Sequence, residues 1–429
     1  MNPEVVDIES IVAGGDGLAR RHERPVVFVP RTAPGERVEV EYVEERRQWA
    51  RARALRIIEP SPERRLPPCR HYDACGGCQL QHLRYDAQLR AKAGIVADAL
   101  RRLGGLDVAP PEVVPSSSEL EYRNRVTFTL KRTRGGVVAG LHAVEDPRRV
   151  IDLDRCPLAE PPIDRAWTTL RASWGSDAER LPPGRELRLT LRASQDGAVG
   201  LAIEGGTEGR GDPELLLERV DGLAAIWYLG PGGVVDWQVG PSALPDRWGA
   251  HDLLLSGSAF VQVNRAMAAK LEAYVQQQCG EVAELRAVDA YCGFGLRAIE
   301  LAVAGAQVSA IDSDHHAIAV GRGAAVESAA QLRFIAGAVE DALPQEMPAD
   351  LVLLNPPRRG VAGVVIDALL GEPPARIIYQ SCDPATLARD LSRLAESFEL
   401  QGCQAFDMFP QTAHVETVVT LAQRPRRKV

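Results

Sequence analysis

The chain has 429 residues, 45% of them hydrophobic, so it is long enough to form two or three domains with separate cores. It contains no run of 18 apolar residues and does not begin with a basic segment followed by an apolar one, so we expect a cytoplasmic protein without a membrane span or signal peptide. The net charge of −8 excludes a uniformly basic coat for nucleic acid. Eight cysteines in such a chain indicate metal binding, catalysis or burial rather than disulfides.

Residues 1–59 are predicted to form a small all-β domain. Glycine- and proline-containing turns separate four candidate strands, at 5–11, 26–29, 36–42 and 49–58. A basic run surrounds Trp49 and comprises Arg46, Arg47, Arg51, Arg53 and Arg56. In small barrels such cations bind phosphates while the aromatic ring stacks on a base, although a solvated strand edge can have the same composition.

Four cysteines have the spacing of a metal centre: Cys69, Cys75, Cys78 and, far along the chain, Cys156. The glycine pair before Cys78 allows a tight loop around one centre. Four thiolates also suit zinc, but zinc sites usually show two short cysteine pairs. Three clustered cysteines and a distant one followed by proline are typical of iron–sulfur ligation, so we expect a [4Fe–4S] cluster. The alternative is a set of unrelated buried cysteines.

Residues 60–245 are predicted to form a β-rich central domain that carries this cluster. A helix is expected over 85–103, and strands are expected at 122–130, 137–141, 186–192 and 198–203. A second basic patch flanks the first of these strands and comprises Arg123, Arg125, Lys131, Arg132 and Arg134.

Residues 246–429 alternate between strand and helix patterns, which predicts a parallel sheet in an α/β domain. The strand at 286–291 is followed by Gly293, and the next strand ends at Asp312. The glycine lets the backbone approach a ligand, and an acidic residue at that point can accept both ribose hydroxyls. The third glycine of a dinucleotide fingerprint is missing, which favours a nucleoside ligand without pyrophosphate. Asn355 and two prolines follow a later strand, at the sheet edge where open α/β folds bind ligands.

Two reactive side chains lie near the carboxyl end of the chain. Cys382 is expected between a strand at 377–379 and a helix that begins at Pro384 and is capped by Asp383. The positive end of a helix dipole there favours the thiolate, although a small buried cysteine at a strand end fits the same pattern. Glu416 opens a β-branched run, where a carboxylate is well placed for proton transfer.

Six segments resemble the S-adenosylmethionine-dependent RNA uracil-C5 methyltransferases, in that family's order along the chain: CGGCQLQH, FVQVN, DAYCGFG, LLNPPRRG, SCDPATLARD and DMFPQTAHVE. The resemblance implies a Rossmann-like methyltransferase domain in which Cys382 is the nucleophile and Glu416 the base. It also implies contacts to the methyl donor from Gln262, Tyr291 and Asp312.

The N-terminal segment, with its GGDGLAR turn, resembles the TRAM module of RNA-modifying enzymes. A TRAM module together with a four-cysteine cluster resembles the enzymes acting on 23S ribosomal RNA, whereas the tRNA-specific branch typically lacks both. The resemblance therefore implies an enzyme that forms 5-methyluridine in 23S ribosomal RNA, and we expect it to be a monomer.

Three positions depart from the family pattern. Leu296 and Ala338 stand where polar residues, often Asn, are usual, and Asn355 stands where Asp is usual. The first two departures remove hydrogen bonds to the donor, so one alternative is an RNA-binding scaffold with a decayed donor pocket. The third leaves open a methyltransferase that acts on an exocyclic amino group held by Asn355.

Overall fold

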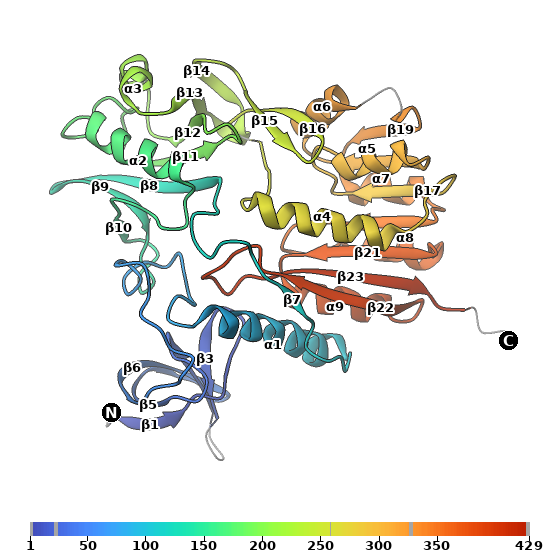
Figure 1. Ribbon diagram of the computed structural model, residues 1–429, viewed down its shortest axis with the longest axis horizontal. Coiled ribbons are helices and arrows are strands. Elements are labelled where there is room, and N and C mark those ends of the chain that lie inside the picture. The colour runs from blue at the N-terminus through green and yellow to red at the C-terminus, as the bar shows by residue number, and fades with distance from the viewer. Residues whose placement is uncertain (1–2, 21–24, 258, 326–328, 426–429) are drawn as a thin grey trace. The chain divides into compact units, whose positions relative to one another are not determined.

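The computed structural model describes residues 3–20, 25–257, 259–325 and 329–425. Contacts divide the chain into two compact units, each formed from separate segments (Figure 1). The first unit comprises residues 1–65, 82–117 and 266–429, and the second comprises residues 66–81 and 118–265. No helix in the described ranges is long and apolar enough to cross a membrane.

The N-terminal part of the first unit is a six-stranded sheet in the order β1-β5-β6-β4-β3-β2. Its strands are β1 (Glu4–Asp7), β2 (Ser10–Ile11), β3 (Asp16–Ala19), β4 (Val26–Pro30), β5 (Arg37–Glu45) and β6 (Trp49–Glu59). Alternating apolar side chains such as Val27, Val38 and Val40 fill a small core. Three of the four strands expected from the sequence are confirmed, the one expected at 5–11 is divided into β1 and β2, and β3 is an additional strand that begins within the glycine-rich turn.

An eight-stranded sheet forms the carboxyl-terminal part of the first unit, in the order β19-β18-β17-β20-β21-β23-β22-β7. Its strands are β7 (Val113–Val114), β17 (Arg286–Ala290), β18 (Gln307–Asp312), β19 (Leu332–Ala336), β20 (Leu351–Leu354), β21 (Arg376–Ser381), β22 (Phe398–Phe406) and β23 (Glu416–Gln423). Strands β19, β18, β17, β20 and β21 pair in parallel, and β23 is antiparallel to both β21 and β22. The expected α/β domain with a parallel sheet is therefore confirmed.

Helices connect these strands and cover the sheet (Figure 1). They are α4 (Arg265–Cys279), α5 (Leu296–Val303), α6 (His315–Ala324), α7 (Val339–Glu346), α8 (Gly363–Gly371) and α9 (Pro384–Leu394). Helix α9 begins as the sequence predicts, because the Asp383 side chain accepts hydrogen bonds from the backbone N–H groups of Ala385 (3.0 Å) and Thr386 (2.9 Å). The strand order reverses between β17 and β20, which places the ligand-binding point of such folds at their carboxyl ends.

Helix α1 (Tyr85–Gly104) belongs to this first unit rather than to the central domain expected from the sequence. Its apolar side chains Val96 and Leu100 join the core of the eight-stranded sheet, and the helix packs against α9. A Cβ at Gly104 would lie 3.2 Å from the carbonyl oxygen of Ala388, so glycine allows this close approach. The compact units therefore do not divide at residue 60, where the sequence predicted a boundary. The reason is that the apolar face of α1 packs against elements that lie far along the chain.

The second unit contains a seven-stranded sheet in the order β10-β9-β8-β11-β12-β13-β14. The strands are β8 (Arg125–Thr133), β9 (Gly136–His142), β10 (Val150–Asp152), β11 (Glu186–Ala193), β12 (Val199–Gly205), β13 (Leu223–Leu229) and β14 (Val235–Val239). Helices α2 (Pro161–Ser173) and α3 (Pro213–Arg219), the 3-10 turn at Pro231–Gly233 and the hairpin of β15 (Leu244–Trp248) and β16 (His251–Leu255) complete the unit. Buried Trp167 stacks on Phe128 at 3.9 Å between ring centroids in its core.

Candidate active site

Four of the residues predicted to bind the donor lie at one edge of the eight-stranded sheet. Tyr291 and Gly293 follow β17, Asp312 ends β18, and Asn355 follows β20. The Asp312 carboxylate accepts hydrogen bonds from the backbone N–H groups of Gly293 (Oδ2, 2.8 Å) and Asp314 (Oδ1, 2.8 Å). Asp312 therefore fixes the glycine-containing turn, and its contact with a donor ribose stays a prediction.

The backbone of this turn has the conformation that glycine favours. Gly293 and Gly295 have φ values of 58° and 67°, and Tyr291 adopts a left-handed φ of 61°. A Cβ on Gly293 would meet no atom within 4 Å, so the space beside it is open, whereas one on Gly295 would lie 2.5 Å from the Phe334 ring. One glycine thus allows a ligand to approach and the other allows close packing.

The Tyr291 side chain carries an unsatisfied polar group. Its hydroxyl is buried and has no hydrogen-bond partner among the described residues. A buried hydroxyl without a partner is costly, so a polar ligand at this edge would satisfy it. Together with the open space beside Gly293, this fits a nucleoside-containing donor.

The three departures from the family pattern also lie near this edge. Leu296 is the first residue of α5, and Ala338 is the N-cap of α7, where it provides no side-chain cap. The backbone N–H of Asn355 donates to the carbonyl oxygen of Ala290 at 3.3 Å.

Gln262 lies in the second compact unit, after β16, so its position is described with that unit alone. Its carbonyl oxygen accepts a hydrogen bond from Asn124 Nδ2 at 2.9 Å. The Asn124 backbone N–H donates to the Val263 carbonyl oxygen at 3.0 Å. The FVQVN segment is thereby fastened to the start of β8, and the role of Gln262 toward a donor stays a prediction.

Cys382 and Glu416 lie at the carboxyl edge of the same sheet, at the ends of two neighbouring strands. Cys382 immediately follows β21, and Glu416 begins its antiparallel neighbour β23. The charge of Glu416 affects the pKa of the Cys382 thiol, so the two groups are electrostatic neighbours. Sequence reasoning predicted each residue separately, and the structure brings them together.

The Cys382 thiol has a raised pKa, which differs from the thiolate-favouring environment expected from the helix N-terminus. Burial is the largest cause, and the nearby charge of Glu416 raises the pKa further. The charge of Arg358 and a hydrogen bond from its side chain act in the opposite direction. Arg358 is thus a site residue that sequence reasoning missed, although it lies in the LLNPPRRG segment.

Glu416 is almost completely inaccessible, with 3% of its surface exposed. Burial raises the pKa of its carboxyl group from the usual 4.5 to about 7, although a hydrogen bond from Gln380 and the charges of Arg297 and Arg358 lower it. A carboxyl group with a pKa near neutrality can both accept and release a proton at physiological pH.

Buried polar contacts hold the loop that leads to Glu416. The Lys92 ammonium of α1 donates to the Asp407 carboxylate and to the Phe409 carbonyl oxygen (3.0 Å), and both charged side chains are fully buried. Gln88 donates to the Gln411 side-chain oxygen at 3.0 Å and accepts from its backbone N–H at 3.0 Å. The DMFPQTAHVE segment is therefore fixed by α1, a helix more than three hundred residues away in sequence.

Asp390 performs a similar structural role for the SCDPATLARD segment. Its Oδ2 accepts hydrogen bonds from the Tyr379 hydroxyl (2.8 Å) and from the backbone N–H of Val361 (2.9 Å). The segment after Asn355 is thereby joined to β21, which precedes Cys382, and to α9, which follows it.

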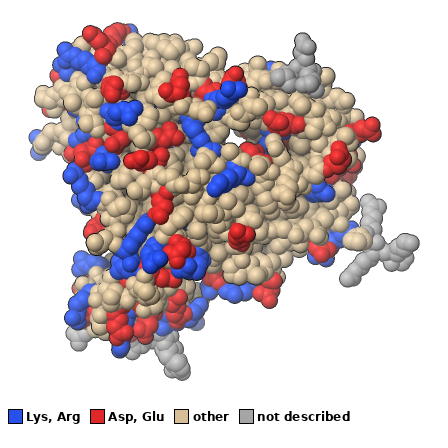
Figure 2. Space-filling view, in the orientation of Figure 1, with Lys and Arg blue, Asp and Glu red and all other residues tan. Residues whose placement is uncertain are grey.

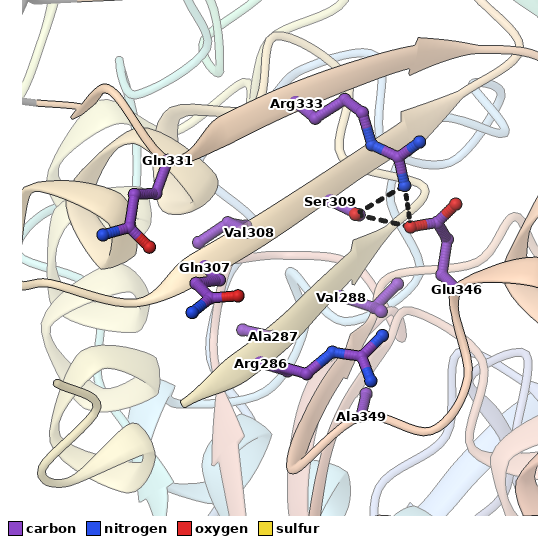
Figure 3. A pocket seen from close by; sticks show the side chains of 10 residues that line it. All are labelled: Arg286, Ala287, Val288, Gln307, Val308, Ser309, Gln331, Arg333, Glu346 and Ala349. Atoms are coloured by element: carbon purple, nitrogen blue, oxygen red, sulfur yellow. Dashed lines mark hydrogen bonds and ion pairs between the residues drawn. The ribbon is translucent and has the colours of Figure 1, made fainter. Parts of the chain in front are cut away.

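A separate pocket of about 230 Å³ lies at the opposite edge of the sheet (Figure 3). It is lined by the first residues of β17 and β18, Arg286 and Gln307, and by Ser309, whose hydroxyl donates to Glu346 at 2.7 Å. Arg333 forms an ion pair with the same glutamate. None of the predicted site residues lines this pocket.

The four cysteines of the predicted cluster are neighbours in the second unit. Burial raises the pKa of the Cys78 thiol to about 12, and the charges of Cys156 and Cys75 also raise it. Burial also raises the pKa of the Cys156 thiol, and the charges of Cys75 and Cys69 raise it further. Within the described ranges, however, no group of three or more Cys, His, Asp or Glu side chains has the arrangement of a metal site.

The basic patches predicted from sequence are largely engaged with protein groups. In the N-terminal sheet, Arg51, Arg53 and Arg56 lie 3.3, 2.7 and 3.3 Å from carboxylates of Asp16, Glu41 and Glu39 respectively. Figure 2 shows basic and acidic side chains interspersed over this sheet, at the lower left.

In the second unit, Arg123 is half-buried beside Cys78 and Cys156, and Arg132 donates to the carbonyl oxygens of Ala178 and Gly184, each at 2.7 Å. These two arginines therefore bind protein groups rather than forming an exposed patch.

Comparison with known proteins identifies the family. The family profile described as tRNA (uracil-5-)-methyltransferase matches residues 339–424, and the methyltransferase small domain matches residues 271–371. An RNA methyltransferase of Synechocystis sp. is 36% identical over 95% of this chain and 93% of its own length, and one of Gloeobacter violaceus is 33% identical over 97% and 95%. The chain belongs to the RNA uracil-C5 methyltransferase family. It is an S-adenosylmethionine-dependent RNA methyltransferase.

A solved structure extends the similarity over nearly the whole fold. The tRNA (uracil-54, C5)-methyltransferase of Pyrococcus abyssi, in complex with S-adenosyl-L-homocysteine, superposes with a TM-score of 0.76 and 26% identity. The match covers 97% of this chain and 99% of that one. The expected methyltransferase fold is therefore confirmed.

Proposed function

We propose that this methyltransferase forms 5-methyluridine through a covalent bond between Cys382 and C6 of the target uracil, with Glu416 as the base. The observation that supports this best is the pairing of a half-buried thiol and a buried carboxyl with a pKa near 7 at the carboxyl edge of the sheet. Methylation of an exocyclic amino group through Asn355 would leave this pair without a role.

The proposed chemistry follows from the electron demand of uracil. C5 is too electron-poor to attack a methyl donor directly, so the Cys382 thiolate first adds to C6 and leaves a carbanion at C5. S-adenosylmethionine, when bound, supplies the electrophilic methyl group that C5 takes. Glu416 then removes the C5 proton, the electron pair of that C–H bond re-forms the C5–C6 double bond, and the thiolate leaves. The target base must leave its stack for Cys382 to reach it.

Tyr291, Gly293, Asp312 and Asn355 are the proposed donor contacts in the first unit. The unsatisfied Tyr291 hydroxyl and the open space beside Gly293 support this assignment. We also assign Gln262 to the donor site, from the resemblance of its FVQVN segment.

For the substrate we propose 23S ribosomal RNA, on the resemblance of the N-terminal segment to a TRAM module and on the four cysteines. tRNA is the second candidate, because the Pyrococcus abyssi enzyme whose name specifies tRNA matches almost every residue of this chain. The overall architecture is therefore compatible with either RNA as the substrate. We place the reaction in the cytoplasm, with a monomeric enzyme.

We further propose that Cys69, Cys75, Cys78 and Cys156 hold a [4Fe–4S] cluster. Their mutual electrostatic contact supports this, as does the backbone N–H of Gly77, which donates to Cys75 Sγ at 3.4 Å. The cluster would join the Cys69–Cys78 loop to the turn at Cys156. Protein purified without oxygen should contain iron and sulfide, and stoichiometric zinc without iron would contradict the assignment.

The decisive experiment compares ribosomal RNA and tRNA from cells with and without the gene by mapping 5-methyluridine. Loss of one uridine methylation in 23S ribosomal RNA supports the proposal, and loss in tRNA alone supports the second candidate. In vitro, Glu416→Gln should accumulate a protein–RNA adduct on a denaturing gel that requires both the donor and Cys382. An adduct that survives Cys382→Ala would contradict the mechanism, and calorimetry showing no donor binding would favour a scaffold.

A further inference from the structure

Glu416 is held by a side chain from the neighbouring strand. Gln380, on β21, donates from Nε2 to Glu416 Oε1 at 2.7 Å. Gln380 is 1% exposed and Glu416 3% exposed, so this hydrogen bond is shielded from water. In such an environment a hydrogen bond to a carboxylate is strong and directional.

Arg297 determines which end of the Gln380 amide faces Glu416. An Arg297 Nη2 group donates to Gln380 Oε1. Arginine carries only donors, so the amide oxygen must face Arg297 and the amide NH₂ must face the carboxylate. If the amide were reversed, two donors would meet at Arg297 and two acceptors at Glu416.

Arg297 is itself fixed from a third element. Its Nε lies 2.5 Å from Glu272 Oε2 and its Nη2 lies 2.7 Å from Glu272 Oε1, a bidentate pair between α5 and α4. The contacts therefore run from Glu272 through Arg297 and Gln380 to Glu416, and they connect four elements of the first unit.

We propose that Gln380, oriented by Arg297, is the positioning residue that holds the Glu416 carboxylate ready for removal of the uracil C5 proton. This inference rests on the proposed function. Gln380 occupies Oε1, so we assign Oε2 to accept the proton. A donor directed at the carboxylate also favours its ionised form, which proton removal requires.

The ionisation of Glu416 also depends on other charged groups packed around it. Arg297 from α5 and Arg358 from the segment after β20 favour the carboxylate, whereas Glu272 from α4 opposes it. Cys382 at the end of β21 is a further electrostatic neighbour. Gln380 is uncharged, so replacing it leaves these charges around Glu416 unchanged.

The test is a titration of Glu416 in the full-length protein without RNA. Selective ¹³C labelling of glutamate carboxyl carbons gives a resonance that is assigned by its absence in Glu416→Gln. In Gln380→Leu the titration midpoint should move to higher pH by about one unit, because a donor to the ionised form is lost. Gln278→Leu is the matched control, since Gln278 accepts a hydrogen bond from Thr420 of the same strand β23 at 3.0 Å but does not contact Glu416.

A single-turnover experiment gives a second measurement. The pH dependence of the decay of the covalent adduct should shift in Gln380→Leu in the same direction as the carboxyl titration does. If Gln380→Leu does not fold, Gln380→Met provides the same loss of the donor with a more flexible side chain.

The outcomes separate the inference from the proposed function. An unchanged Glu416 titration in a folded Gln380 variant overturns the positioning role even if the enzyme makes 5-methyluridine. If the wild-type enzyme makes no 5-methyluridine, the proposed function fails, while the titration still decides whether Gln380 controls the ionisation of Glu416.

Discussion

Replacing Glu416 by glutamine should make the protein more stable at pH 8 but not at pH 5. The pKa of this buried carboxyl group is raised from 4.5 to about 7, chiefly by burial. The folded state therefore disfavours the ionised form, and the stability due to this group falls as the pH rises from about 4.5 through 7. Above pH 7 the cost is about 3 kcal/mol, since each pKa unit corresponds to about 1.4 kcal/mol.

Glutamine has the same shape as the protonated acid and can still accept the hydrogen bond from Gln380. At pH 5 the wild-type carboxyl is mostly protonated, so the two proteins should unfold at nearly the same temperature. At pH 8 the variant should unfold several degrees higher. Calorimetry of the two proteins at equal scan rates at both pH values measures the difference.

The control is Glu399→Gln, at an exposed position on the adjacent strand β22, which should change neither transition. Asp289 is a second buried carboxyl whose pKa is raised to about 7, mainly by burial, so the Glu416 variant should retain part of the pH dependence. If the unfolding temperature shifts equally at both pH values, or is lower at pH 8, the pKa of the Glu416 carboxyl is not raised as the structure indicates.

Three other changes test separate parts of the site. Lys92→Met should destabilise the protein by about 3–5 kcal/mol, because it leaves the fully buried Asp407 carboxylate without its cation, and Lys92→Met combined with Asp407→Leu should restore much of that loss in thermal unfolding. Arg358→Gln should shift the pH dependence of Cys382 alkylation to higher pH, since the Arg358 charge and hydrogen bond lower the thiol pKa; a rate profile identical to wild type would contradict this contact. Replacing Arg51, Arg53 and Arg56 together by glutamine should weaken RNA binding and reduce its salt dependence, whereas an unchanged slope would place the RNA surface elsewhere.

The sequence predicted those features that local patterns determine. The turn from β21 into α9 has the expected strand, cap and first proline because Asp383 and Pro384 act within a few residues of each other. The placement of Asp312 and Gly293 was predictable for the same reason, since a β-α-β pattern brings a turn and the next strand end together.

Features that depend on distant segments were not predictable. The direction of the Cys382 pKa change depends on how deeply the thiol is buried, and no local pattern specifies burial there. The Glu272–Arg297–Gln380 contacts join α4 and α5 to β21, and Glu272 and Gln380 are more than a hundred residues apart in sequence. Helix α1 was assigned to the central domain because its amphipathic pattern shows that one face is buried but not against which sheet.

The proximity of Cys382 and Glu416 has a consequence for the order of events in the proposed mechanism. Two negative charges at this edge oppose each other, and the charge of Glu416 indeed raises the pKa of the Cys382 thiol. Arg358 favours the ionised form of both groups. Addition of the thiolate to uracil converts it to a neutral thioether, and methyl transfer then removes the charge that the addition placed on the base. Glu416 then no longer competes with the thiolate for Arg358 at the stage when the C5 proton must be removed. The nucleophile and the base thus use the charge of Arg358 one after the other.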